Sequence, residues 1–313
     1  MAGTTSPLGD AKPSGAPERT DSFHLPDGRQ LAWAEWGPAD GRPVLSLHGT
    51  PGSSRYCEDA VATAEMGVRL IAPDRPGFGD SDPMPGRSLL DTADDIQALM
   101  AALDVKAMPI VGISSGVPFA MACAVRRPEA VTTLALVAGD APLDELPPAA
   151  GEEAEELRER IARRRADPFA ARAELLEKTS WFAERPESIL DNANAGDTSD
   201  EPDAVMRRTP EFRAAFLPML RHAAKQGSAG WVDDSLAITL PWGFSPADIR
   251  CPTTVWFGDR DFMASRRDSE HLAATIPGAR SVVLPNEGHS LPIRNWRAIL
   301  TSVLSSQDVS ARG

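Results

Sequence analysis

Residues 108–127 read MPIVGISSGVPFAMACAVRR, and this stretch decides the fold. Its first part, up to Ile113, is a short apolar run typical of a buried strand, and its last part, from Gly116 on, is compatible with a helix. Between them, residues 112–116 form a G-x-S-x-G pattern centred on Ser114. We therefore predict a strand, a sharp turn and a helix, with a serine hydroxyl exposed at the turn.

The glycines decide which of the two adjacent serines can react. The residues two before and two after Ser114 are Gly112 and Gly116, which carry no side chain that would collide in a tight turn. The corresponding neighbours of Ser115 are both branched residues. Ser114 is therefore the candidate nucleophile, and a glycine-rich packing turn is the alternative interpretation.

Apolar runs alternate with helix-like segments on both sides of this stretch. The runs PVLSL, VRLIAPD, VTTLALVAG and TTVWF are short and rich in branched residues, which is typical of a mostly parallel sheet covered by helices on both faces. The alternation stops near residue 140 and resumes near residue 251. We predict an α/β core over 22–140 and 243–313, an inserted helical cap over 141–242, and a disordered Pro- and Gly-rich tail over 1–21.

A serine needs a base to remove its proton, and the chain has five histidines. His289 directly follows the strand-like run SVVLP, where a loop reaches the same sheet edge as Ser114. The other four lie in a hairpin, in an early loop or in helix-like stretches, where structural roles are more common: His24, His48, His222 and His271. His289 is therefore the candidate base, and a surface loop histidine is the alternative.

The orienting acid should lie at the end of the preceding strand. TTVWF is followed by Gly258-Asp259-Arg260-Asp261, which gives the chain order serine, aspartate, histidine expected for this type of sheet. Asp261 is the first choice, because the loop must turn before a carboxylate can reach back to the histidine. Asp259 and Asp140 are the two alternatives.

A developing oxyanion needs two N–H donors. The backbone N–H of Ser115, at the start of the expected helix, is one candidate. The loop HGTPGSS, which begins at His48, follows another strand and is rich in small residues, so Thr50 is the second candidate. The alternative is that this loop is only a turn.

Composition restricts the partners and the compartment. A formal net charge of -13 repels phosphate backbones, so nucleic acid is not expected as a partner. No apolar run is long enough to span a bilayer, and no signal peptide is recognisable, so we expect no membrane partner. The three scattered cysteines fit a reducing cytoplasm and form no metal-ligand pattern. The oligomeric state stays open.

These motifs together resemble the α/β-hydrolase superfamily. The resemblance rests on HGTPGSS, DRPGFGDS, GISSG, GDRD and the final GH, in that order along the chain. It implies an eight-stranded, mostly parallel sheet with a helical cap after the sixth strand. It also implies no cofactor or metal. A serine at position 114 argues against the dehalogenase and epoxide hydrolase branches, whose nucleophile is an aspartate.

The expected activity is that of a carboxylesterase-like serine hydrolase acting on a small, partly apolar ester, thioester, lactone or amide. Ser114 would form an acyl-enzyme, and aromatic residues of the cap are candidates for the pocket lining: Trp181, Phe182, Phe212, Phe216 and Trp231. HGTPG also resembles the HGGPG of proline iminopeptidases, so an aminopeptidase is one alternative. The others are a non-catalytic ligand-binding receptor and a lyase or C–C bond hydrolase on the same fold.

Overall fold

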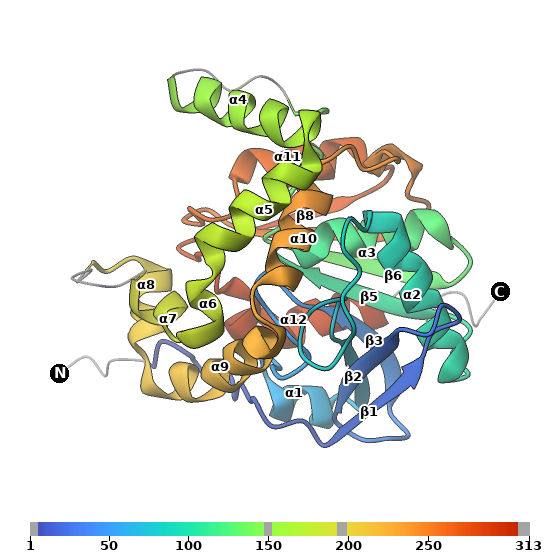
Figure 1. Ribbon diagram of the computed structural model, residues 1–313. Helices are drawn as coiled ribbons and strands as arrows, with labels where there is room; N and C mark the ends of the chain where they lie inside the picture. Colours follow the sequence, from blue (N-terminus) through green and yellow to red (C-terminus); the bar gives the residue numbers. More distant parts are fainter. Residues whose placement is uncertain (1–5, 147–151, 193–198, 306–313) are drawn as a thin grey trace.

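A computed structural model describes residues 6–146, 152–192 and 199–305 of the 313-residue chain. Eight strands form one sheet in the order β1-β2-β4-β3-β5-β6-β7-β8 (Figure 1). The first strand pairs antiparallel with the second, and the second antiparallel with the fourth, while all other pairs are parallel. The strands are β1 (Arg19–His24), β2 (Gln30–Trp36), β3 (Arg42–Leu47), β4 (Val68–Pro73), β5 (Met108–Ile113), β6 (Val131–Val137), β7 (Thr253–Gly258) and β8 (Arg280–Leu284).

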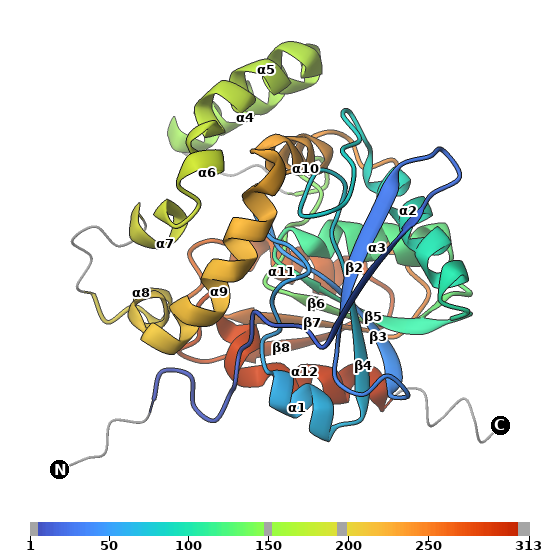
Figure 2. The ribbon, with the colours of Figure 1, turned by 60° about the horizontal axis from the view of Figure 1, so that its bottom comes forward.

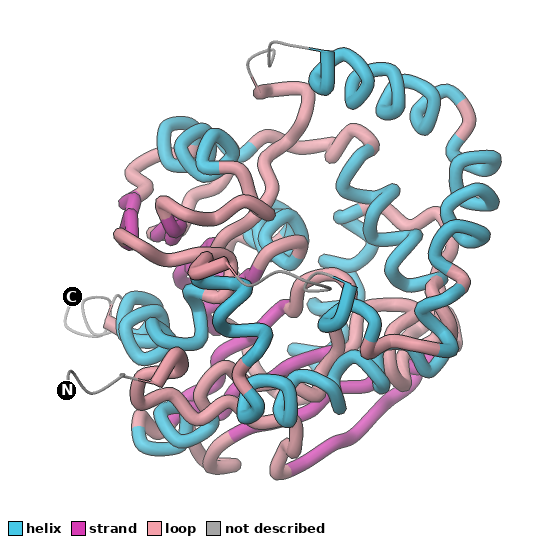
Figure 3. Tube along the Cα trace, turned by 90° about the vertical axis from the view of Figure 1, so that its left-hand side faces the viewer, coloured by secondary structure: helices cyan, strands magenta, loops and turns pink. Residues whose placement is uncertain are grey.

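Helices cover both faces of this sheet. One face packs against α2 (Leu89–Ala102), α3 (Gly116–Arg126) and α11 (Arg266–Thr275), and the other against α1 (Ala60–Glu65) and α12 (Leu291–Leu304) (Figure 2). In Figure 3 the strands form one layer with helices on both sides of it. The predicted fold class is confirmed.

Alternation along the strands explains the two buried faces. Neighbouring side chains of a strand point to opposite sides of the sheet. Leu45 accordingly packs in the cluster that contains the α2 and α3 side chains, while its neighbour Val44 packs with those of α1 and α12. Both are fully buried, so adjacent apolar residues occur in a central strand such as β3.

The inserted segment after β6 is helical and lies over the carboxyl-end loops of the sheet. It begins with α4 (Glu152–Ala166), α5 (Pro168–Thr179), α6 (Trp181–Glu184) and α7 (Ser188–Asn192). It continues with α8 (Pro202–Arg208), α9 (Pro210–Ala223) and α10 (Ala229–Thr239), which are joined by short loops and a 3-10 turn over Ala224–Gln226. Parts of the predicted cap and its loops, residues 147–151 and 193–198, lie outside the described residues.

The N-terminal segment over 1–21 is predicted to be disordered, but the part of it that the structure describes is ordered. Residues 1–5 lie outside the described residues, but Ser14 pairs with Cys57 in an isolated β-bridge, and β1 already begins at Arg19. Leu8 and Ala11 are buried in a cluster with side chains of α9 and α12. Composition indicated disorder because it carries no information on tertiary contacts. Leu8 and Ala11 are ordered by packing against helices that are far away in the sequence.

Candidate active site

Ser114 lies on the sharp turn between β5 and α3, and its φ angle is 53°. A positive φ is unusual for a residue with a side chain, and such backbone strain is common at functional sites. The space around Gly112 and Gly116 shows why both positions flanking the serines are glycine. A Cβ on Gly112 would lie 2.8 Å from the Cβ of Ala120, and a Cβ on Gly116 would lie 2.1 Å from the carbonyl oxygen of Leu47. Both positions therefore need glycine for the turn to pack.

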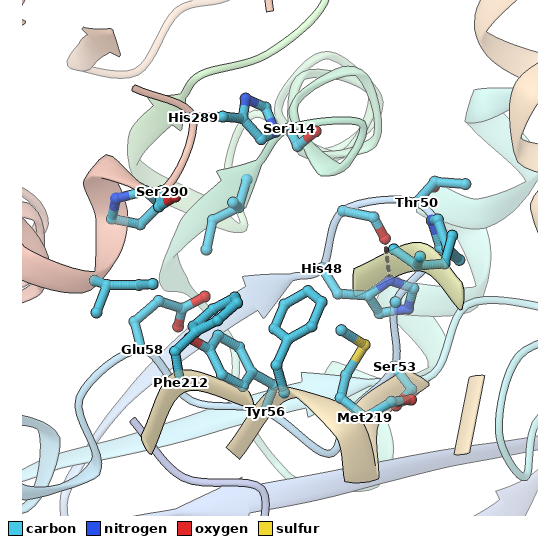
Figure 4. Close-up of a pocket in the computed structure, with 18 of the residues that line it drawn as sticks. His48, Thr50, Ser53, Tyr56, Glu58, Ser114, Phe212, Met219, His289 and Ser290 are labelled. Carbon is cyan, nitrogen blue, oxygen red and sulfur yellow. Dashed lines mark hydrogen bonds between the residues drawn. The ribbon is translucent and has the colours of Figure 1, made fainter. Parts of the chain in front are cut away.

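Three predicted residues come together above this turn. The Nε2 atom of His289 lies 2.9 Å from the Oγ of Ser114, and its Nδ1 lies 2.9 Å from the Oδ2 of Asp261. Ser114 follows β5, Asp261 follows β7 and His289 follows β8, so three strand ends supply the set. Figure 4 shows the His289 ring beside Ser114. With the proton on Nδ1, His289 can donate to Asp261 and accept the proton of the serine hydroxyl.

The two aspartates of the GDRD loop have different tasks. Asp261 uses Oδ1 to accept the backbone N–H groups of Met263 and Ala264, at 2.8 and 2.9 Å, which leaves Oδ2 for His289. Asp259 instead accepts the backbone N–H of Asn286 at 2.7 Å. Asp259 thus ties the β7 loop to the β8 loop, whereas the hydrogen bonds of the histidine ring go to Asp261 and Ser114.

Asp140, the third candidate acid, follows β6 and makes no hydrogen bond to His289 within the described parts of the chain. Burial raises the pKa of Asp140 to about 6, and the charge of Asp268 acts in the same direction. A carboxyl group of this kind is a weaker partner for an imidazolium than the hydrogen-bonded Asp261.

The pKa of His289 is raised above its ordinary value of 6.5. Burial alone would lower it, but the hydrogen bond and the charge of Asp261 outweigh that effect, and the charges of Asp203 and Asp140 add to it. The protonated imidazole is therefore stabilised, which is what a base needs when it has taken a proton in a transition state.

Sequence reasoning missed Asp203, which comes from α8 of the cap. Its Oδ2 accepts the backbone N–H of His289 at 2.7 Å, and its Oδ1 accepts the backbone N–H of Ser290 at 2.7 Å together with the Ser290 hydroxyl. A cap residue thus fixes the loop that carries the histidine. No sequence signal could have found it, because the contact spans 86 residues and EPDAVM carries no motif.

The predicted oxyanion donors flank Ser114. A Cβ on Gly49 would lie 3.2 Å from the Cβ of Ser114, so the loop that carries Thr50 passes close to the serine. Within the residues that the structure describes, the backbone N–H groups of Thr50 and Ser115 have no hydrogen-bond acceptor. Two N–H donors of this kind next to the candidate nucleophile could bind a negatively charged oxygen.

A buried charge network holds this loop in place. Arg75 donates to the carbonyl oxygen of Gly49 at 3.2 Å and to the hydroxyl of Thr50 at 2.9 Å, and it also donates to the carbonyl oxygen of His48. Asp234, from cap helix α10, accepts from Arg75 at 2.6 Å and from the Thr50 hydroxyl at 2.5 Å. The cap therefore takes part in positioning the loop, which sequence reasoning also missed.

His48 serves the same loop and is not a second base. Its Nδ1 lies 2.7 Å from the carbonyl oxygen of Gly49, and its Nε2 accepts the backbone N–H of Arg75 at 3.3 Å. Burial, with the nearby positive charge of Arg75, lowers the pKa of His48 well below its ordinary value. The ring is therefore neutral and structural.

A cavity of about 270 Å³ opens beside Ser114 and His289. Apolar side chains from the cap line much of it, among them Phe216 and also Phe212 and Met219, which Figure 4 labels. Of the five aromatic residues expected as lining, Phe212 and Phe216 line the cavity. The other three pack on one another as edge-to-face pairs, with ring centroids 5.3 to 6.2 Å apart: Trp181, Phe182 and Trp231.

One group of potential metal ligands occurs among the described residues. Ligand atoms of Asp74, Asp80 and His222 lie within 4.8 Å of one another, but none of these residues lines the cavity. Asp80 pairs with His222 at 3.0 Å and with Lys225, while Asp74 accepts the backbone N–H of Ser54 at 2.7 Å. Protein donors therefore already satisfy these carboxylates. In the described residues, no helix is both long and apolar enough to cross a membrane.

The chain belongs to the alpha/beta hydrolase fold family, whose model matches residues 42–295. A non-heme chloroperoxidase of Streptomyces lividans is 38% identical over 92 residues, which cover 29% of this chain and 33% of the relative. A proline iminopeptidase of Xylella fastidiosa (strain 9a5c) is 32% identical over 129 residues, which cover 38% of this chain and 41% of the relative. The chain thus matches 33% to 41% of the length of the first curated relatives.

Solved structures share the whole fold. A thermophilic esterase of Thermogutta terrifontis aligns over 92% of this chain and 97% of that chain, with a TM-score of 0.63 and 24% sequence identity. At this identity the likeness concerns the fold alone.

Proposed function

We propose that this protein is a serine hydrolase that cleaves an ester, thioester, lactone or amide of a small, partly apolar substrate. The observation that carries the proposal is the continuous chain of hydrogen bonds from Ser114 through His289 to Asp261, with 2.9 Å at each step. Membership of the alpha/beta hydrolase fold family and the adjoining cavity support it.

The mechanism follows from the roles that these atoms can fill. Nε2 of His289 takes the hydroxyl proton as the Oγ of Ser114 attacks the carbonyl carbon of the substrate. The oxygen of the tetrahedral intermediate becomes negative, and the backbone N–H groups of Thr50 and Ser115 stabilise it. His289 then gives its proton to the leaving group, which departs and leaves an acyl-enzyme on Ser114. Water, activated by the same histidine, hydrolyses this ester and restores the serine.

Asp261 stabilises the imidazolium and holds the ring in the tautomer with its proton on Nδ1. Its carboxylate is suited to this task because it is almost fully buried and is fixed by two backbone N–H groups. The residues in this scheme need no cofactor or metal ion for any step.

A panel of substrates tests the reaction class. p-Nitrophenyl esters of increasing chain length, a thioester, a lactone series and amino-acid naphthylamides should be compared by kcat/KM on the same enzyme preparation. We expect hydrolysis of at least one acyl class and its loss in Ser114→Ala. Hydrolysis that persists in folded Ser114→Ala contradicts the proposal.

An aminopeptidase is the second candidate, and the partial match to a proline iminopeptidase favours it. Preferred hydrolysis of prolyl naphthylamide over every ester would establish this second activity in place of an esterase. A folded protein that hydrolyses none of the panel would favour a ligand-binding role on the same fold.

A further inference from the structure

Two polar side chains in the cavity have no part in the proposed mechanism. Glu58 and Tyr56 both lie in the loop between β3 and α1, and both line the cavity. Figure 4 shows them with Phe212 on one side of the cavity, away from Ser114 and His289. They therefore face a part of a bound substrate that lies away from the bond to be cleaved.

The backbone around Glu58 is held firmly, so its side chain does not enter the cavity by chance. The preceding residue, Cys57, forms a two-way backbone bridge with Ser14, with N···O distances of 2.9 and 3.0 Å. The following residue, Asp59, caps α1 by accepting the backbone N–H of Ala62 at 3.0 Å. Glu58 thus projects from a fixed position between two anchored neighbours.

Both polar groups are buried without a partner. Glu58 is only 7% exposed, and within the described ranges its side chain makes no hydrogen bond or ion pair with another residue. The hydroxyl of Tyr56 is likewise buried with no hydrogen-bond partner. A buried polar group without a partner is destabilising, so such groups in a cavity are suited to a ligand that satisfies them. Burial raises the pKa of Glu58 to about 7, which a bound cation would reverse.

Aromatic rings line the same cavity as the carboxyl group of Glu58. Tyr56 packs edge-to-face on Phe216, with 5.1 Å between ring centroids, and Phe216 stacks on Phe212 at 4.9 Å. All three rings line the same cavity as Glu58. The faces of aromatic rings attract cations, most strongly where water is excluded. A cavity lined by one carboxylate and three aromatic rings is therefore a suitable environment for a positively charged group.

The other charged residues of the cavity do not compete for this role. Asp203 already accepts hydrogen bonds from the backbone of His289 and Ser290. Arg207 also lines the cavity, but it has an interaction partner of its own. The net charge of -13 on the whole chain further favours the approach of a cation over an anion.

The geometry points to an ammonium-binding subsite formed by Glu58, Tyr56 and the neighbouring Phe rings, which would make the substrate an amine-bearing ester or amide. That the bound molecule is a substrate rests on the proposed hydrolase function. The protonated amine would donate to the Glu58 carboxylate and to the Tyr56 oxygen, and its methylene groups would lie along Phe212 and Phe216. The amine would stand away from the scissile carbonyl, at the other side of the cavity.

Equilibrium binding tests the subsite without any catalysis. Hexylammonium, 1-hexanol and hexanoate should be titrated calorimetrically into Ser114→Ala, alone and combined with Glu58→Gln or Tyr56→Phe. We expect hexylammonium to bind most tightly and Glu58→Gln to weaken it about tenfold or more. Tyr56→Phe should weaken it by a smaller factor.

Glu65→Gln is the matched control. Glu65 lies in α1, pairs with Arg297 on the surface and does not line the cavity, so this variant removes the same charge at a distance from the subsite. Melting temperatures check that each variant is folded. Equal binding of hexanol and hexylammonium, tightest binding of hexanoate, or an unchanged hexylammonium Kd in folded Glu58→Gln would each overturn the inference.

Catalysis provides a second readout that also tells on which side of the scissile bond the amine lies. One substrate pair is 6-aminohexanoyl and heptanoyl p-nitrophenyl ester, and the other is 5-aminopentyl and hexyl acetate. In one of the two pairs, the amine-bearing substrate should have a kcat/KM about tenfold higher than that of its methyl counterpart. Glu58→Gln should abolish this preference, whereas Glu65→Gln should keep it. Ser114-dependent hydrolysis without preference in either pair overturns the subsite and leaves the hydrolase proposal standing. Absence of all hydrolysis leaves the calorimetric result to decide the subsite.

Discussion

The hydroxyl of Thr50 donates a hydrogen bond of 2.5 Å to the carboxylate of Asp234, which joins the proposed oxyanion loop to cap helix α10. Asp234 also pairs with Arg75 at 2.6 Å and with Arg87 at 2.5 Å, and all three side chains of this ion cluster are fully buried. Burial opposes ionisation of Asp234, but the two arginines outweigh it and hold its pKa at about 2. The cap is thereby a structural part of the site as well as its cover.

Asp234→Asn should be strongly destabilising and should also impair catalysis. It removes the paired carboxylate of Arg75 and the nearer of the two carboxylates that pair with Arg87, and breaking a buried ion pair from one side costs about 3–5 kcal/mol. The Thr50 loop loses its anchor in the same step, so kcat should fall in the variant molecules that remain folded. Urea denaturation and kcat on one activated ester measure the two effects.

Asp233→Asn is the matched control for this prediction. Asp233 is adjacent and also buried, but it pairs mainly with Arg172 at 2.7 Å, whose side chain is 24% exposed and can regain water. We expect a smaller loss of stability and little change in kcat. If Asp233→Asn lowers stability and kcat more than Asp234→Asn does, the network centres on Asp233 and the assignment of Asp234 is wrong.

Ser114→Ala should abolish hydrolysis, with a fall of about 10⁴-fold or more in kcat, while the fold persists. Ser115→Ala should have a mild effect, because its proposed contribution is a backbone N–H that alanine keeps. Both variants need kcat on the same ester and a melting temperature. A dead Ser115→Ala beside an active Ser114→Ala would reverse the assignment.

Asp261→Asn should lower kcat by about 10⁴-fold, since the amide no longer stabilises the imidazolium or selects its tautomer. Asp259→Asn should instead cost mainly stability, because Asp259 ties the β7 loop to Asn286, while Asp261 is the hydrogen-bond partner of His289. Stopped-flow or steady-state kcat and a thermal melt separate the two effects. Near-normal kcat in both variants would transfer the role of the acid to Asp140.

The dependence of activity on pH should follow His289. The imidazole must be neutral to accept the serine proton, so kcat/KM should be low in acid and rise to a plateau as pH increases. Because Asp261 and its neighbours raise the pKa of His289, the midpoint should lie above 6.5. Asp261→Asn should shift the midpoint of any residual activity downward. A kcat/KM that is flat from pH 5 to 8, on an enzyme shown to be folded, would argue against His289 as base.

Local sequence was sufficient for the parts of the molecule that depend on local rules. The strand-turn-helix around Ser114 follows from two glycines, and the structure shows that a Cβ at either position would collide. Strand ends at one sheet edge explain why Ser114, Asp261 and His289 could be selected together, and the structure brings their side chains within hydrogen-bond distance. Their catalytic roles stay a prediction.

Contacts between distant segments lay beyond the reach of the sequence. Asp203 and Asp234 both act on core loops from the cap, across 86 and 184 residues, and nothing in their local sequence distinguishes them from other cap aspartates. The N-terminal segment was misjudged for the same reason, since its ordered path depends on Leu8 reaching the apolar surface of α9 and α12. Such contacts arise from tertiary packing, which composition does not encode.

Labelling with a fluorophosphonate tests the central claim most directly, because this reagent reacts only with an activated serine nucleophile in its site. The protein should be treated at neutral pH, digested and mapped by mass spectrometry, with His289→Ala and Ser114→Ala treated in parallel. The account predicts one phosphonylated residue, Ser114, with labelling slowed strongly in His289→Ala and absent in Ser114→Ala. An unlabelled folded wild-type protein, or a label on any other residue, would contradict it.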